Sequence, residues 1–315
     1  MESEPTIINR RKPHLWWNQP WTLVEGCTRC SPGCRDCWAL AMEKRTGRAV
    51  TGGYDVRQRE DRLDHPLHWR KPRVVFVLND LFHEQVNHSM FRLGAMTTIA
   101  RTPQHTYLIL TKRADHLRKV IGQCRPPRNA WLGVTCESNA HLDRVAALVR
   151  TPAAVRWVNA HLLGPLDLSV ALPSEYWCLC GYKGNTTGTD YCQDCGEEFA
   201  PPPGDTCLHC ESNIYDSSCP ECGSVEKFGH WSTGPLEDRP ATIDWLAIEC
   251  NRPFRGDPRE WWGWCRALVA QAVAAGVPVW VKQGPLLTGA VTHNIEDFPP
   301  FAQRREFPKE GESDG

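Results

Sequence analysis

The chain repeats one pattern several times: a short apolar run, a few polar residues, and then a stretch with the spacing of a helix. The run Val-Val-Phe-Val-Leu at 74–78, for example, is followed by Asn79 and Asp80 and then by a helical stretch at 88–100. Near-continuous apolar runs are typical of strands buried on both faces, and strands that alternate with helices are typical of a parallel sheet. The pattern therefore predicts an α/β fold.

We predict about seven of these units. The predicted strands cover 22–25, 74–78, 105–110, 130–134, 154–158, 243–248 and 277–281, and the predicted helices cover 38–46, 88–100, 141–150 and 258–275, with another that begins at 114. This number of units suits a full or partial β/α barrel of the TIM type. A doubly wound sheet is the alternative.

Polar and ionisable residues follow almost every predicted strand. They are Asp80, His83, Lys112, Arg113, Glu137, His161, Glu249 and Lys282. In a barrel the carboxyl ends of the strands share one face, and active sites lie on that face. Each residue taken alone is explained as a helix cap or a solvated loop residue, but together they predict a site.

Four cysteines, Cys27, Cys30, Cys34 and Cys37, lie within eleven residues after the first predicted strand. Pro32 and Gly33 turn this loop back on itself, so several sulfurs are aimed at one point. Converging thiolates bind a soft metal centre. Since all four come from one loop, an iron–sulfur cluster is favoured over zinc, which usually takes pairs from separate segments. Zinc, or reduced or disulfide-linked cysteines, are the alternatives.

Three cysteines from one loop leave one iron of a 4Fe–4S cluster open to a cofactor or substrate. Cys30, Cys34 and Cys37 have the C-x3-C-x2-C spacing of radical S-adenosylmethionine enzymes, whereas Cys27, Cys34 and Cys37 have a wider C-x6-C-x2-C spacing. The residues do not decide whether Cys27 or Cys30 is the third ligand.

A second cysteine-rich region, 177–231, interrupts the strand–helix pattern. Its eight cysteines form four pairs: Cys178 and Cys180, Cys192 and Cys195, Cys207 and Cys210, and Cys219 and Cys222. A segment with so little apolar sequence does not fold alone, whereas two tetrahedral zinc ions can hold it together. We predict a double zinc ribbon with two structural zinc ions. It is inserted into a barrel formed by 1–176 and 232–303, with a flexible tail at 304–315.

Composition narrows the class of protein. The formal net charge of −1 argues against a nucleic-acid binder that works by bulk charge, but not against a local basic groove. No stretch approaches the ~20 apolar residues of a membrane span, and the N-terminus lacks an apolar signal core. Sixteen cysteines without a secretory signal point to a reducing compartment. We therefore expect a cytoplasmic protein with no membrane partner.

The chain resembles a phage- and prophage-associated family with a three-cysteine motif, regarded as similar to radical S-adenosylmethionine enzymes. The resemblance rests on segments spread over nearly all the chain outside the cysteine-rich insertion: 17–18, 26–28, 31–34, 37–39, 66–72, 80–84, 103–106, 110–113, 131–134, 162–165, 243–245, 276–278 and 282–283. The family's three cysteines match Cys27, Cys34 and Cys37, so Cys30 is an extra cysteine in this chain.

The chain departs from the family at two acidic positions. Where the family has Ser-Ala-Glu-Pro, this chain has Asn159-Ala-His161, so the acid is replaced by His161. Where the family has Gly-Gly-Glu-Ser, the chain has Ala247-Ile-Glu249-Cys250, which keeps the acid but not its glycines. The resemblance implies that this acid lies near the methionine part of S-adenosylmethionine.

The resemblance and the strand-end pattern together imply a radical S-adenosylmethionine-like enzyme that modifies or repairs a nucleotide or nucleic acid and needs an electron donor. Glu249, Glu137 and Lys282 would position the cofactor, Asp80, His83 and Lys112 would face the substrate, and all six are candidate catalytic residues. One alternative is a scaffold whose cysteine sites all hold zinc and which binds nucleic acid or a protein without redox chemistry. Another is a barrel enzyme with a purely structural cluster.

Overall fold

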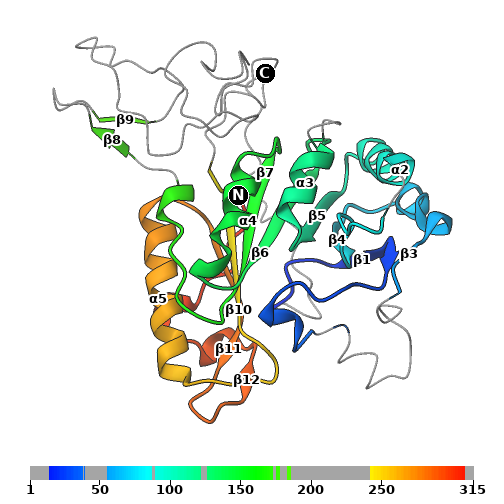
Figure 1. Cartoon of the computed structure of the whole chain (residues 1–315). Helices are drawn as coiled ribbons and strands as arrows, with labels where there is room; N and C mark the ends of the chain where they lie inside the picture. The colour runs from blue at the N-terminus through cyan, green and yellow to red at the C-terminus, as the bar shows by residue number, and fades with distance from the viewer. Residues whose placement is uncertain are drawn as a thin grey trace. The chain divides into compact units, whose positions relative to one another are not determined.

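The computed structural model describes residues 14–37, 39, 55–86, 89–121, 126–172, 175–177, 183–185 and 242–308. The chain divides into two compact units, Met1–Val170 with Ile243–Gly315, and Ala171–Thr242. The first unit holds the large sheet (Figure 1). The predicted zinc ribbon falls within the second unit, but all eight of its cysteines lie outside the described residues, as does most of the helix predicted at 38–46.

The large sheet has eight strands in the order β1-β4-β5-β6-β7-β10-β11-β12. They are β1 Gln19–Thr22, β4 Val74–Leu78, β5 Thr106–Thr111, β6 Ala130–Cys136, β7 Val155–His161, β10 Trp245–Glu249, β11 Val279–Pro285 and β12 Val291–Thr292. Every neighbouring pair is parallel except β11 with β12. The predicted α/β fold with a mostly parallel sheet is confirmed.

Helices follow four of these strands and flank the sheet (Figure 1). They are α2 Ser89–Ala100, α3 Ala114–Ile121, α4 Leu142–Val149 and α5 Pro258–Ala274. Helix α5 is capped by Asp257, the residue before its first turn, whose carboxylate accepts a hydrogen bond from the Arg259 N–H at 2.8 Å. A capping aspartate followed by proline is a strong helix start, and Gly276, with a φ of 70°, ends the helix as predicted.

Shorter elements complete the described chain. β2 Val24–Glu25 pairs with β3 Arg57–Gln58, and β8 Glu175–Trp177 pairs with β9 Lys183–Asn185, both antiparallel. The 3-10 helices are η1 Pro32–Cys34, η2 Glu60–Arg62, η3 His65–His68, η4 Asn139–His141, η5 Ser169–Ala171, η6 Ile295–Asp297 and η7 Pro300–Ala302.

The structure differs from the sequence-based prediction at both ends of the sheet. The first strand was predicted at 22–25, but β1 covers 19–22. Pro20 weakens the strand signal, yet proline is tolerated because β1 is an edge strand.

The C-terminal tail was predicted to begin at 304, but Arg305 forms a β-bridge with Trp280, and the ring of Phe307 lies 4.9 Å from the ring of Trp280. This aromatic contact holds 304–308 against the sheet.

Tryptophans fill one face of the sheet. Trp131, Trp157, Trp245 and Trp280, from four successive strands β6, β7, β10 and β11, belong to one buried cluster. Trp16, which precedes β1, packs edge-on against Trp157 and Trp245, with ring centroids 6.1 and 6.3 Å apart. The segment just before the edge strand β1 thus contacts the fifth and sixth strands of the sheet order, which indicates a curled sheet. The strand pairs of the described residues do not include one that closes the sheet into a barrel.

Successive side chains along a strand point to opposite faces. Residues two or four positions after these tryptophans therefore share their face, nearer the carboxyl ends of the strands. Asn159 and His161 follow Trp157 in this way, and Glu249 follows Trp245. The pairing of β10 with β11 is irregular next to Lys282, which is placed by its contacts instead: its Nζ bonds Glu249 and lies 4.9 Å from the Trp16 ring. These four polar residues therefore lie on the tryptophan-covered face of the sheet, nearer the carboxyl ends of the strands than the tryptophans.

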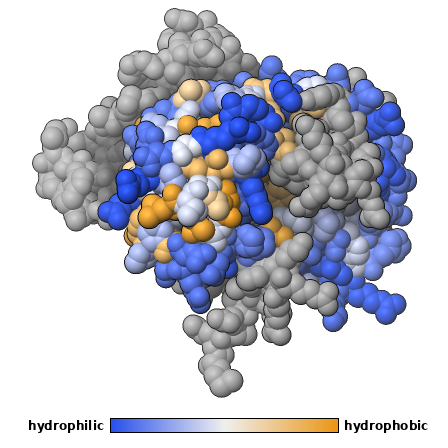
Figure 2. Space-filling model, turned by 90° about the horizontal axis from the view of Figure 1, so that it is seen from below, coloured by the Kyte–Doolittle hydropathy of each residue, from blue (hydrophilic) through white to orange (hydrophobic). Residues whose placement is uncertain are grey.

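The exposed large hydrophobic side chains of the described residues come from several separate elements: Leu67, Met90, Leu93, Val170, Val273 and Leu287. Figure 2 shows a gathering of hydrophobic residues on the lower face, bordered by hydrophilic ones. In the part of the chain that the structure describes, no helix is both long and apolar enough to cross a membrane.

Candidate metal centre and strand-end site

The cysteine loop, residues 27–37, starts from a backbone turn that only glycine fits. Gly26 has a φ of +82°, and a Cβ there would lie 2.0 Å from the Asp55 carbonyl oxygen. The loop then turns through η1, where the Cys34 N–H donates to the Ser31 carbonyl at 3.0 Å. All four cysteines of the loop are free thiols.

Cys30 and Cys34 are close enough for their side chains to share a hydrogen bond. This bond lowers the pKa of Cys34, and Lys112 and Ser31 lower it further, whereas the pKa of Cys30 is raised. Burial raises the pKa of the Cys27 thiol to about 11. Cys34 is therefore the thiol most favoured as a thiolate, the form that binds metal.

These sulfurs do not form a finished coordination site. Within the described ranges, no three or more His, Cys, Asp or Glu side chains are grouped closely enough to hold a metal ion. The set of donors nevertheless has the chemistry of a soft-metal site, because four free thiols lie in one short loop and one favours the thiolate. Metal binding at this loop requires the sulfurs to draw together.

Glu137, at the end of β6, attaches the cysteine loop to the sheet. Its side chain is 1% exposed, and its Oε1 accepts hydrogen bonds from Lys112 Nζ and, at 2.6 Å, from Ser31 Oγ. Burial would raise the pKa of Glu137, but the charge and hydrogen bond of Lys112 hold that pKa below its ordinary value. Gly33 packs against this pair, because a Cβ there would lie 2.4 Å from Glu137 Oε1.

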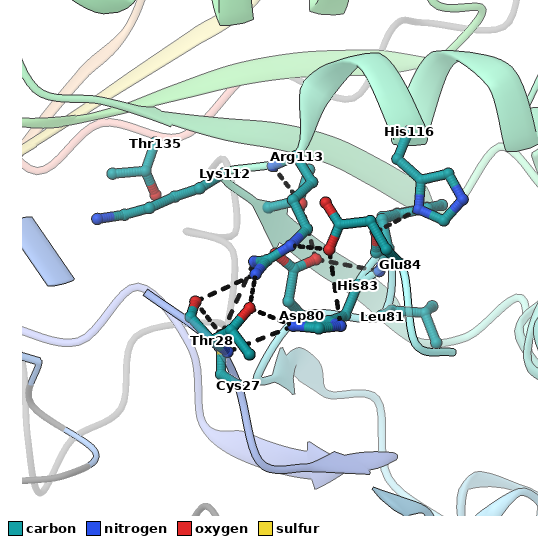
Figure 3. Close-up of polar contacts among 12 residues, drawn as sticks. Cys27, Thr28, Asp80, Leu81, His83, Glu84, Lys112, Arg113, His116 and Thr135 are labelled. Carbon is teal, nitrogen blue, oxygen red and sulfur yellow. Dashed lines mark hydrogen bonds and ion pairs between the residues drawn. The ribbon is translucent and has the colours of Figure 1, made fainter. Parts of the chain in front are cut away.

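Arg113 makes a second attachment between the cysteine loop and the strand ends of the sheet (Figure 3). Its buried guanidinium donates to Asp80 Oδ2 at 2.9 Å and to Glu84 Oε2 at 2.6 Å. The same group donates to the Thr28 carbonyl and hydroxyl oxygens, at 3.1 and 2.8 Å, and approaches Cys27 Sγ at 3.8 Å. One arginine thus ties the ends of β4 and β5 to the start of the cysteine loop.

His83 is buried and contacts the same loop. Its Nδ1 accepts a hydrogen bond from the Gln85 N–H, so the ring is neutral, and its Nε2 shares a hydrogen bond with Thr28 Oγ1 at 2.8 Å and lies 3.3 Å from the Thr28 backbone N–H. Burial, followed by the nearby charge of Arg113, lowers the pKa of His83 and favours this neutral form. The histidine therefore orients Thr28.

A second polar group lies at the ends of β7, β10 and β11. Glu249 accepts hydrogen bonds from Lys282 Nζ at 2.5 Å and from Asn159 Nδ2 at 2.9 Å. Burial would raise the pKa of Glu249, but Lys282 and then His161 hold it at about 2. His161 also contacts Asn251 through its Nε2. The Oδ1 of Asn159 is buried and accepts no hydrogen bond from any described residue.

A family model matches residues 13–294 of the chain, which takes in both of these side-chain groups. The chain belongs to the family described as protein of unknown function (DUF5131). No curated protein and no solved structure matches it. The family match carries no link to phage proteins or to radical S-adenosylmethionine enzymes, so that resemblance stays a prediction.

In this DUF5131 chain the predicted site residues form two groups. Asp80, His83, Lys112, Arg113 and Glu137 gather around the cysteine loop, and His161, Glu249 and Lys282 form the second group. Asp80 and His83 are buried and bond to the loop and its supports, not to open space. Sequence reasoning missed Thr28, Ser31 and Asn159. The available signals were the position of Thr28 and Ser31 next to cysteines and the position of Asn159 directly after the strand predicted at 154–158.

Proposed function

We propose that this protein is an iron–sulfur enzyme of the radical S-adenosylmethionine type. The observation that carries the proposal is the position of the cysteine loop. Four free thiols lie beside the ionisable strand ends of a curled parallel sheet, and basic side chains reach two of their sulfurs. Parallel α/β sheets bind ligands outside the carboxyl ends of their strands.

We infer that the sheet is a partial β/α barrel. Its seven parallel strands follow the order of the chain, whereas the strand order of a doubly wound sheet reverses at a switch point. The packing of Trp16 against Trp157 and Trp245 supports the curvature that a barrel needs. In a barrel, the cysteine loop and the Glu249 group share one rim.

The cluster would be held by Cys34, Cys37 and either Cys27 or Cys30. With S-adenosylmethionine, it supplies one-electron chemistry that starts a radical reaction, and an external electron donor must reduce it. Metal binding by thiolates requires loss of their protons, and the neighbours of Cys34 already favour that loss. The chain's own contribution is to hold the sulfurs and to orient the cofactor.

The second group suits the orientation of a polar cofactor. Lys282 and Glu249 present opposite charges, and the free Oδ1 of Asn159 can accept a hydrogen bond from a ligand. Lys282 Nζ also lies 4.9 Å from the ring of Trp16, which keeps the ammonium in place. The Lys282–Glu249 pair is only partly buried, with side chains 21% and 12% exposed, so a ligand can reach it. Partial burial of the two charges still costs desolvation energy, so the presence of the pair at strand ends favours a ligand-binding role.

The remaining assignments rest on the sequence. We propose a nucleotide or nucleic acid as substrate because of the family resemblance, and a reducing, cytoplasmic setting because of the cysteine content. Two structural zinc ions in the 177–231 insertion stay part of the proposal. Lys112 stays a candidate for contact with substrate and Glu137 for positioning the cofactor, whereas we assign Asp80 and His83 to positioning the cysteine loop.

Anaerobic reconstitution with iron and sulfide tests the function. The expected result is an iron–sulfur absorption spectrum, and cleavage of S-adenosylmethionine once the protein is reduced. Cys34→Ser should abolish both, whereas Cys265→Ala, which changes a buried cysteine of α5, should keep both. A wild-type chain that takes up zinc in the loop and no iron would support the zinc scaffold instead.

A further inference from the structure

Two consecutive basic residues at the end of β5 reach two different cysteines. Lys112 Nζ lies 3.6 Å from Cys34 Sγ, and Arg113 Nη1 lies 3.8 Å from Cys27 Sγ. Consecutive side chains at a strand end diverge, so the two cations approach the loop from different sides. Figure 3 shows Lys112 and Arg113 pointing in different directions.

Each cation is held in place by a buried carboxylate. Lys112 is paired with Glu137, which is 1% exposed, and Arg113 is paired with Asp80, which is 5% exposed. Each also donates to an oxygen of the cysteine loop: Lys112 to Ser31 Oγ at 3.0 Å, three residues before Cys34, and Arg113 to the carbonyl of Thr28 at 3.1 Å, directly after Cys27. Positive charge is therefore fixed beside both sulfurs.

We propose that Lys112 and Arg113 are positioning residues that hold the sulfurs of Cys34 and Cys27 and raise the reduction potential of the iron–sulfur centre. This inference rests on the proposed function. Reduction adds one negative charge to a cluster that thiolates already make negative, and adjacent cations with N–H···S hydrogen bonds stabilise that charge. Cluster potentials depend on net charge and on hydrogen bonds to the sulfurs.

The experiment uses the reconstituted full-length protein and measures the midpoint potential of the cluster by redox titration. Lys112→Met and Arg113→Met should each lower it by about 59 mV or more, a tenfold change for a one-electron step. Lys112→Arg and Arg113→Lys keep a cation. The midpoint potential should therefore fall in each of them by less than half of the fall seen in the corresponding methionine variant. Lys119→Met, an equal charge change on the exposed side of α3, should leave the potential unchanged.

The result that overturns the inference is a normally loaded cluster whose potential is unchanged in both methionine variants. An equal fall in Lys119→Met would also overturn it, because the effect would then be one of overall charge. If Lys112 and Arg113 had a purely structural role, the methionine variants would bind less cluster, but the cluster that they do bind would keep the wild-type midpoint potential. Measuring both the amount of bound cluster and its potential separates a structural role from an electrostatic one.

A cobalt titration covers the case in which wild-type protein takes up no iron, or the methionine variants fail to load. Cobalt bound by thiolates gives a sulfur-to-cobalt charge-transfer absorption, and the cysteines of 177–231 also contribute to it. The part of this absorption that is lost in Cys34→Ser therefore reports on cobalt bound by the cysteine loop. Lys112→Met and Arg113→Met should weaken cobalt binding at least tenfold while the far-ultraviolet circular dichroism is kept. Unchanged cobalt affinity would overturn the inference that the two cations hold these sulfurs. Absence of iron in the wild type would overturn the proposed function and, with it, the effect on the reduction potential, but not the holding of the sulfurs.

Discussion

The Ser31 hydroxyl donates a hydrogen bond of 2.6 Å to Glu137 Oε1, although 106 residues separate them in the chain. Lys112 joins the same contact, since its ammonium donates to Ser31 Oγ at 3.0 Å and to Glu137 Oε1. A buried carboxylate at the end of β6 thus fixes the middle of the cysteine loop. Sulfurs on a short loop keep their position only if the loop is held in this way.

Replacement of Glu137 by glutamine should lower the free energy of unfolding by about 3 kcal/mol, because it leaves Lys112 without its charged partner. Urea denaturation measures this loss, and Glu60→Gln, an exposed change on η2, should cost less than about 0.5 kcal/mol. Equal stabilities for the two variants would show that Glu137 does not hold the loop.

Gly33→Ala should displace the loop without removing any donor. The new Cβ would lie 2.4 Å from Glu137 Oε1 and 3.1 Å from Lys112 Nζ, so the ion pair and the loop must move apart. We expect iron uptake on reconstitution to fall to less than half. The matched control is Gly263→Ala in α5, where a Cβ meets nothing within 4 Å. That change should leave uptake intact and stabilise the helix by up to about 1 kcal/mol.

The low pKa of Glu249 predicts a specific acid sensitivity. Its pKa falls from 4.5 to about 2 in the folded protein, so its stabilising contribution is present above pH 4.5 and is lost as the pH falls toward 2. That contribution is about 3 kcal/mol at most. Glu249→Gln should therefore reduce the loss of stability measured between pH 4.5 and 2, whereas the exposed Glu296→Gln should not. Parallel pH profiles for wild type and Glu249→Gln would contradict this.

Trp16→Ala tests the curvature of the sheet. Because Trp16 is 3% exposed and packs against Trp157 and Trp245, its loss should cost about 3–5 kcal/mol of unfolding free energy. Leu287→Ala removes a side chain that is 75% exposed and should change stability by less than about 0.5 kcal/mol. If Trp16→Ala were as stable as that control, the segment before β1 would not close over β7 and β10.

Local patterns in the sequence were sufficient to predict six of the eight strands of the large sheet, β4, β5, β6, β7, β10 and β11, whereas β1 was misplaced and β12 was not predicted. The strand 74–78 was predicted with the bounds that β4 has, and α5 was predicted from its start at Pro258 to within one residue of its end. Apolar runs and helix ends are local signals, so they can be read without knowledge of the fold. β1 was misplaced because its strand character comes from its edge position and not from its own residues.

The partners within the site could not be predicted from the sequence. Glu137 and Glu249 both follow strands and both pair with lysine, but only the fold shows that Lys112 meets the first and Lys282 the second. Asp80 and His83 were expected to face substrate, and their burial against Arg113 and Thr28 depends on the direction of side chains after β4. Such contacts join residues far apart in the chain, and no local pattern encodes them.

Metal content after anaerobic purification and reconstitution tests the central claim most directly, with wild type and Cys34→Ser compared side by side. Iron and acid-labile sulfide should bind to the wild type at about four of each per chain, as a 4Fe–4S cluster requires, and should be absent from Cys34→Ser. Wild-type protein that holds no iron, or Cys34→Ser protein that holds as much as the wild type, would contradict the assignment of the cysteine loop as an iron–sulfur site.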